Sequence, residues 1–112
     1  MDCLFCKIIA GDIPSTKVYE NEDVYAFRDI NPQAPVHVLV IPKKHIASIG
    51  DVNEDNLDAV SAVLKSIPLI AKGENLSGGF RVVSNCGQDA CQSVHHLHFH
   101  VLGGTQLADK MA

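Results

Sequence analysis

Short hydrophobic runs alternate with polar turn segments over much of the 112-residue chain. Runs rich in Val, Ile, Tyr and Phe, bounded by residues that favour turns, are typical of β-strands. Five such runs predict strands: residues 18–20, 24–28, 36–41, 80–84 and 94–102. The first three follow one another with short turns between them, so we expect an antiparallel meander.

The hydrophobic period changes in the middle of the chain. Apolar residues recur there at intervals of three or four, as on one face of a helix: Leu57, Val60, Leu64, Ile67 and Ile70. Asn53 is the expected N-cap, and Pro68 predicts a kink or an early end before Gly73. A short apolar segment at residues 4–10, stopped by Gly11, predicts a second helix. Together these elements predict an α+β fold.

Composition narrows the class of protein. A chain of 12.1 kDa with 46% hydrophobic and 20% charged residues predicts a single globular domain over residues 1–112. The net charge of −4 and the absence of a basic run argue against binding to a polynucleotide. No signal-like or membrane-spanning stretch is visible, so we expect a cytoplasmic protein with no membrane partner.

Three histidines alternate with apolar residues near the end of the chain. If residues 94–102 form a strand, His96, His98 and His100 project from one face, about 6 to 7 Å from neighbour to neighbour. One such histidine is most simply a solvent-facing polar residue, whereas three in register indicate a shared task, either metal binding or phosphate chemistry. Ligands at every second position of one straight strand converge poorly on a tetrahedral ion, which favours phosphate chemistry.

Phosphate chemistry assigns different tasks to these rings. A neutral His98 can attack phosphorus through one ring nitrogen while a backbone carbonyl holds the other nitrogen protonated. His100, protonated or donating, can hold a phosphoryl oxygen. The preceding polar loop, residues 85–93, offers an amide, a hydroxyl and backbone N–H groups that can cradle an anion.

The segment HLHFHVL at residues 96–102 resembles the signature of the histidine-triad (HIT) family. Residues 27–46 and the tripeptide QSV at residues 92–94 resemble the purine nucleoside phosphoramidate hydrolases of that family. The resemblance extends from Cys3 to Gly104. It implies a HIT-like α+β fold with a five-stranded antiparallel sheet, one long and one short helix, and a homodimer across which the sheet continues.

The resemblance also implies a reaction, the hydrolysis of purine nucleoside 5′-phosphoramidates to a nucleoside monophosphate, such as AMP or GMP, and an amine. His98 would form a nucleotidyl-histidine intermediate, assisted by His100 and Ser93, with His37 behind the triad. The implied nucleotide-binding residues are Phe5, Phe27, Asp29, Ile30, Asn85, Cys91, Gln92, Ser93, His98 and His100. The alternatives are a dinucleoside polyphosphate hydrolase, a nucleotidyltransferase, or a nucleotide-binding module without turnover.

The sequence departs from the family pattern at two places, one in the phosphate loop and one in the C-terminal segment, which bears on leaving-group preference. Cys91 stands where the family usually has glycine, so the backbone there must accommodate a side chain. The segment Thr105 to Ala112 lacks the Trp-Pro-Pro-like ending of animal relatives.

Cys3 and Cys6 form a C-x-x-C pair, which is half of a zinc site and is otherwise a pair of free thiols. The resemblance to bacterial-type HIT proteins implies that His45 and His96 complete it. A closed Cys₂His₂ site leaves no open coordination position, so the expected zinc is structural.

Overall fold

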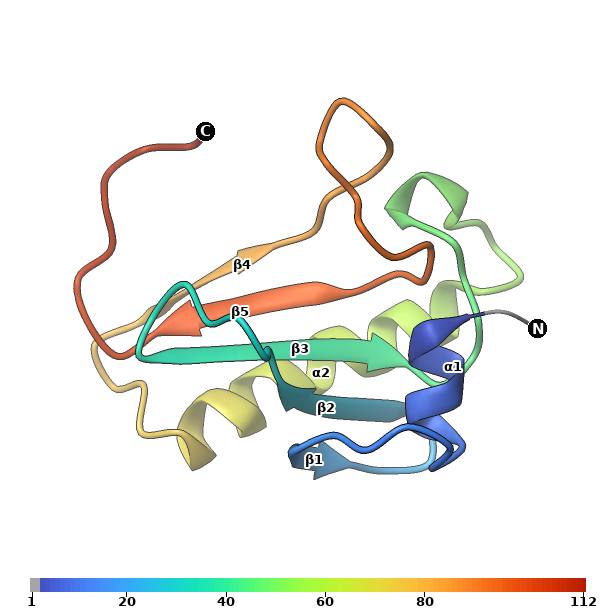
Figure 1. The fold of residues 1–112 in the computed structure, drawn as a ribbon, viewed down its shortest axis with the longest axis horizontal. Helices are drawn as coiled ribbons and strands as arrows, with labels where there is room; N and C mark the ends of the chain where they lie inside the picture. The colour runs from blue at the N-terminus through green and yellow to red at the C-terminus, as the bar shows by residue number, and fades with distance from the viewer. Residues whose placement is uncertain (1–2) are drawn as a thin grey trace.

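The computed structural model describes residues 3–112, which form one five-stranded antiparallel sheet with a helix on each face. The strands lie in the order β1-β2-β3-β5-β4 (Figure 1). Their bounds are Lys17–Glu20 (β1), Val24–Arg28 (β2), Val36–Pro42 (β3), Phe80–Val83 (β4) and Phe99–Gly103 (β5). The helices are α1 (Leu4–Ile9), the 3₁₀ turn η1 (Ile49–Asp51) and α2 (Leu57–Gly73). The predicted α+β sheet is confirmed.

The two faces of the sheet carry separate hydrophobic clusters. Alternate side chains of a strand point to opposite faces. In β3, Val38 and Val40 therefore pack with α2 in the larger cluster, whereas Leu39 and Ile41 pack with α1 in the smaller one. Figure 1 shows α1 in front of the sheet and α2 behind it. Within residues 3–112, no helix is long and apolar enough to cross a lipid bilayer.

The long helix starts later than its sequence predicts and continues past Pro68 to Gly73, the predicted outer limit. Asn53 is not its N-cap: the Asn53 side chain accepts from the N–H groups of Asp55 and Asn56, which stabilises a separate turn ahead of α2. Pro68 lies inside the helix without ending it. Proline has no backbone N–H, so the Leu64 carbonyl lacks its helical hydrogen-bond partner. Leu64 and Pro68 both lie on the exposed side of α2, where water can donate a hydrogen bond to that carbonyl.

The last predicted strand is also different. Only Phe99–Gly103 pairs as β5, while residues 94–98 form a bent segment outside the sheet. Tertiary hydrogen bonds hold this segment: the Leu97 N–H donates to the Ile46 carbonyl at 2.6 Å, and the Ser84 hydroxyl donates to the His98 carbonyl at 2.8 Å. His96, His98 and His100 are therefore not one row on a straight strand.

The core face of α2 can be tested with two neighbouring substitutions. Ile67 is 5% exposed in the larger cluster, so Ile67→Ala should lower the free energy of unfolding by about 2–5 kcal/mol in urea. Lys65 is exposed on the same helix, so Lys65→Ala should change the free energy of unfolding by no more than about 0.5 kcal/mol. Equal effects of the two substitutions would contradict this packing.

Candidate active site and metal centre

The three triad histidines divide between two sites. The rings of His98 and His100 lie together, with their centroids 5.1 Å apart. His96 is fully buried and turns instead toward the ring of His45, at 4.9 Å. Phe5, from α1, packs edge-on against both, at 5.2 Å from His98 and 6.0 Å from His96. This ring therefore stands between the two sites.

A backbone carbonyl sets the proton position on His98. Its Nδ1 lies 2.7 Å from the carbonyl oxygen of His96, which can only accept a hydrogen bond. Nδ1 therefore carries the proton, and in the neutral ring Nε2 carries the lone pair. The sequence predicts a backbone carbonyl that holds one nitrogen of His98 protonated, and the structure places that carbonyl at Nδ1.

A second chain of hydrogen bonds orients His100. The Gln33 N–H donates to His37 Nδ1 at 3.0 Å, so the proton of neutral His37 is on Nε2. His37 Nε2 then donates to His100 Nδ1 at 2.9 Å, which leaves the proton of neutral His100 on Nε2. His100 is thereby prepared to donate.

Electrostatics keep this donor neutral. Burial, followed by the neighbouring His98 and His37, lowers the pKa of His100 to about 4, although Asp29 opposes the shift. Burial also lowers the pKa of His37. The lowered pKa favours a neutral His100 over a cationic one, and the neutral form is one of the two states that the sequence left open.

Asp29 lies beside this chain at the end of β2. Its Oδ1 accepts from the Asn31 N–H at 2.8 Å, and its Oδ2 is 3.4 Å from His37 Nε2. Asp29, His37 and His100 are close enough together to hold a metal ion. The hydrogen bond from the Gln33 N–H to His37 Nδ1 disfavours a metal ion here, because it places the His37 proton on Nε2, the nitrogen that would have to bind the metal.

The residues expected around the base differ in exposure. Phe5 and Phe27 are buried and meet edge-on at 5.4 Å between ring centroids. The Ile30 side chain is fully exposed, at 100%. An apolar wall and an exposed apolar side chain are therefore present near the ends of β2 and α1.

The polar loop before β5 is closed by the Gln92 side chain. Its Oε1 accepts from the Gly87 N–H at 3.0 Å, and its Nε2 donates to the carbonyls of Ala47 and Val94 at 2.7 and 3.0 Å. The Gln92 N–H also donates to the Gly87 carbonyl. The polar groups of Gln92 are thus engaged within the chain, where they shape the loop.

Other loop residues remain accessible to a ligand. Ser93 is exposed and Asn85 is half-buried. Cys91 is exposed and has a φ of 60°, in the left-handed region that favours glycine. The backbone therefore keeps a glycine-like conformation despite the thiol, as the departure noted in the sequence requires.

Ser84 is a positioning residue that sequence reasoning missed. Its hydroxyl donates a hydrogen bond to the His98 carbonyl. This bond lies just beyond the last paired residues of β4 and β5, Val83 and His100. A serine at the end of a hydrophobic strand carries no distinctive sequence signal, because turns commonly begin with serine.

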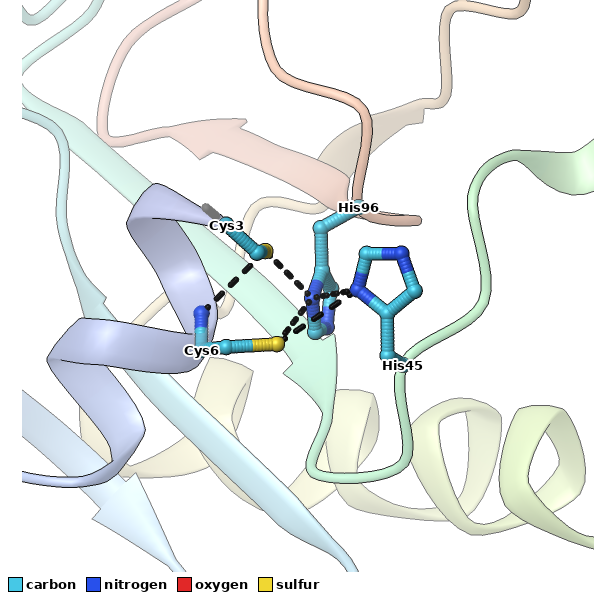
Figure 2. Close-up of side chains that lie close together, drawn as sticks. All are labelled: Cys3, Cys6, His45 and His96. Carbon is cyan, nitrogen blue, oxygen red and sulfur yellow. Dashed lines mark hydrogen bonds between the residues drawn. The ribbon is translucent and has the colours of Figure 1, made fainter. Parts of the chain in front are cut away.

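Cys3, Cys6, His45 and His96 converge from three parts of the chain (Figure 2). Cys3 is the N-cap of α1 and Cys6 lies in its first turn, while His45 follows β3. The donor atoms of the four residues all lie within 4.8 Å of one another. Three sulfur-to-nitrogen separations are short: 3.3 Å from Cys3 to His96, 3.4 Å from Cys6 to His45 and 3.5 Å from Cys6 to His96.

These separations fit a tetrahedral ion. Zinc bonds of about 2.3 Å to sulfur and 2.0 Å to nitrogen require donor atoms about 3.3 to 3.8 Å apart. The two Nδ1 atoms of His45 and His96 are 3.2 Å apart, close to this range. His96 Nε2 donates to the Pro42 carbonyl at 2.8 Å, which leaves the lone pair of Nδ1 facing the cluster.

The Cys6 thiol needs a nearby cation to ionise. Burial, followed by the hydrogen bond and charge of Cys3, raises the pKa of the Cys6 thiol to about 11. A bound cation reverses this effect, because it stabilises thiolate. The four predicted ligands thus form a site suited to a divalent metal, closed by protein ligands on every side.

Comparison with known proteins agrees with this arrangement. Residues 2–111 match the family model described as scavenger mRNA decapping enzyme C-term binding. A histidine triad protein from Clostridium difficile superposes with a TM-score of 0.94 at 51% identity, covering 98% of this chain and 96% of that one. A HIT family hydrolase from Clostridium thermocellum superposes at 0.95 and 46% identity, covering 99% and 97%.

Among sequences, the chain is 47% identical to a 14 kDa zinc-binding protein of Brassica juncea, over 95% of this chain and 96% of that protein. It is 46% identical to the adenylylsulfatase HINT1 of Arabidopsis thaliana, over 93% of this chain and 72% of that protein. With a paired histidine site beside a closed metal-ligand cluster on this fold, the chain belongs to the histidine-triad family.

Loss of one thiolate should empty the metal centre. Cys6→Ser should bind less than about one tenth of the zinc of the wild type and should unfold at least about 5 °C lower, because a ligand bound to the folded state stabilises it. Mass spectrometry of the metal and thermal unfolding measure the two effects. Cys86→Ser, which changes an exposed thiol outside the cluster, should leave both unchanged. Undiminished zinc in Cys6→Ser would contradict the ligand set.

The buried histidines predict how stability depends on pH. The pKa of His100 is about 4 in the folded chain, below its usual value of 6.5, so the unfolded chain takes up more protons between these values. Stability should therefore fall as the pH drops from 6.5 toward 4. In urea unfolding, His100→Gln should lose less stability over this range than the wild type, whereas the exposed His95→Gln should lose as much.

Proposed function

We propose that this chain hydrolyses purine nucleoside 5′-phosphoramidates, and related nucleoside 5′-phosphoryl compounds, through a covalent intermediate on His98. The observation that carries the proposal is the pairing of two imidazoles whose hydrogen bonds favour opposite tautomers. His98 presents a lone pair on Nε2, and His100 beside it presents an N–H on Nε2. A nucleophile next to a neutral hydrogen-bond donor suits attack on a phosphoryl group.

In the first step, His98 Nε2 forms a bond to phosphorus as the bond from phosphorus to the amine breaks. The leaving nitrogen takes up one proton from solvent, relayed by the Ser93 hydroxyl, so that the amine leaves as a neutral molecule. The imidazole becomes positively charged while it keeps its Nδ1 proton, and the His96 carbonyl stabilises that charge. His100 donates a hydrogen bond from Nε2 to a negatively charged phosphoryl oxygen.

In the second step, water attacks phosphorus and the bond to His98 Nε2 breaks. The attacking water gives up one proton to solvent, which balances the proton taken up in the first step. The products are the nucleoside monophosphate and the neutral imidazole, with the lone pair restored to Nε2. Because both steps use the same donors, the neutral state of His100 serves each of them.

Binding of the nucleotide would use the residues on either side of the triad. The Asp29 carboxylate supplies acceptors for the two ribose hydroxyls, since each of its oxygens can accept a second hydrogen bond. Phe5, Phe27 and Ile30 offer apolar surface for a purine such as that of AMP or GMP. Asn85, Ser93 and the backbone around Cys91 would hold the phosphate.

We further infer that the metal is zinc and that it is structural. Relatives described as 14 kDa zinc-binding proteins and the fit of four sulfur and nitrogen donors support this identity. Zinc would tie α1 to the segments that carry His45 and His96. A homodimer that continues the sheet belongs to the same proposal.

Replacement of the nucleophile tests the reaction. His98→Asn should lower kcat/KM toward adenosine 5′-phosphoramidate by at least about 1,000-fold, because no covalent intermediate can form. Mass spectrometry of quenched wild-type enzyme should show a nucleotidyl adduct that His98→Asn lacks. His95→Asn, at the exposed neighbouring histidine, should retain wild-type turnover. Wild-type turnover by His98→Asn would refute the assignment.

The same assay separates the competing functions. Faster turnover of a dinucleoside polyphosphate than of the phosphoramidate would indicate a dinucleoside polyphosphate hydrolase, and transfer to a second phosphate in place of water would indicate a transferase. Binding of AMP with neither adduct nor turnover would indicate a binding module. The relative described as an adenylylsulfatase supports a breadth of nucleoside 5′-phosphoryl substrates.

A further inference from the structure

The metal cluster and the nucleophile are connected by two short physical links. The first is His96, whose imidazole belongs to the cluster while its carbonyl accepts the Nδ1 proton of His98 at 2.7 Å. The second is Phe5, which sits in α1 between the ligands Cys3 and Cys6 and packs perpendicular to the His98 ring, at 90° and 5.2 Å.

The first link depends on how firmly residue 96 is held. Residues 94–98 lie outside the sheet, so no ladder of strand hydrogen bonds fixes the His96 carbonyl. The peptide that carries this carbonyl is held through the Leu97 N–H, which donates to the carbonyl of Ile46, the residue after the cluster residue His45. The His96 ring is held from both nitrogens, by the Pro42 carbonyl at Nε2 and by the cluster at Nδ1. A bond from a metal to Nδ1 would restrict this residue and therefore the direction of its carbonyl.

The second link depends on α1. This helix has six residues, fewer than the roughly 12 that an isolated helix needs to be even marginally stable in water. It is attached to the sheet by the smaller hydrophobic cluster and by its two cysteines. Metal ligation at both Cys3 and Cys6 would hold α1, and with it the Phe5 ring, against His98.

We infer that the Cys3, Cys6, His45 and His96 centre is a positioning device for the nucleophile: when metal is bound, the His96 carbonyl and the Phe5 ring hold His98 in one tautomer and one orientation. This inference rests on the proposed function for its kinetic consequence. It differs from a purely structural role, in which metal raises the stability of the fold and leaves each folded molecule equally active.

Two measurements on metal-loaded and metal-depleted protein test the coupling, at a temperature where circular dichroism shows both forms to be folded. The first is kcat toward adenosine 5′-phosphoramidate per folded molecule, which should fall about 10- to 100-fold on depletion, as expected for a displaced reacting group. The second is the ¹⁵N spectrum of His98, which should change from a single Nδ1–H tautomer to an exchanging mixture. Readdition of zinc should restore both.

Variants extend the test if depletion is incomplete. Cys6→Ser removes a ligand from α1, and His45→Asn removes one from the loop after β3 without altering α1. Both should show the loss of kcat and the mixed tautomer, whereas Cys86→Ser should match the wild type in both measurements. His45→Asn preserves the test should Cys6→Ser fail to fold.

The outcomes are distinct. Depleted, folded protein that keeps both its kcat and the single His98 tautomer overturns the coupling, and so does a fall in kcat with the tautomer unchanged. If loaded wild-type protein shows no turnover of any nucleoside phosphoramidate, the proposed function fails. The ¹⁵N spectra still decide the coupling in that case, because they require no substrate.

Discussion

The hydrogen bond from His98 Nδ1 to the His96 carbonyl is the interaction on which the rest of the site depends. It leaves the lone pair of His98 on Nε2, and at 2.7 Å in a buried position it strongly resists a change of tautomer. It exists only because residues 94–98 leave the sheet, since a straight strand would direct alternate side chains outward. The bent segment is in turn held by Ile46 and Ser84.

The same principle governs the other site histidines. A backbone group fixes one nitrogen of two further rings: the Gln33 N–H acts at His37 and the Pro42 carbonyl at His96. His100 then takes its tautomer from His37. Burial lowers the pKa of His37, His96 and His100, so these rings act through lone pairs and N–H donors rather than through positive charge.

The two faces of the sheet have separate tasks. The larger cluster under α2 contains none of the side chains proposed for the nucleotide site or the metal centre. The smaller cluster under α1 includes Phe5, Phe27 and Cys3, each of which the resemblance links to a nucleotide or a metal. Hydrophobic burial on one face thus supports the fold, while the other face combines packing with chemistry.

The sequence by itself determined the strands at residues 24–28 and 36–41, the helical period of α2 and the presence of a histidine site, because each follows from local periodicity and side-chain chemistry. It also supplied the ligands Cys3, Cys6, His45 and His96 through a family resemblance. Only the tertiary structure decided that residues 94–98 leave the sheet, that Asn53 caps a separate turn, and that His96 serves a different site from His98. The physical reason is that these outcomes depend on hydrogen bonds to groups distant along the chain, such as Pro42 and Ser84, whose positions exist only once the fold has formed.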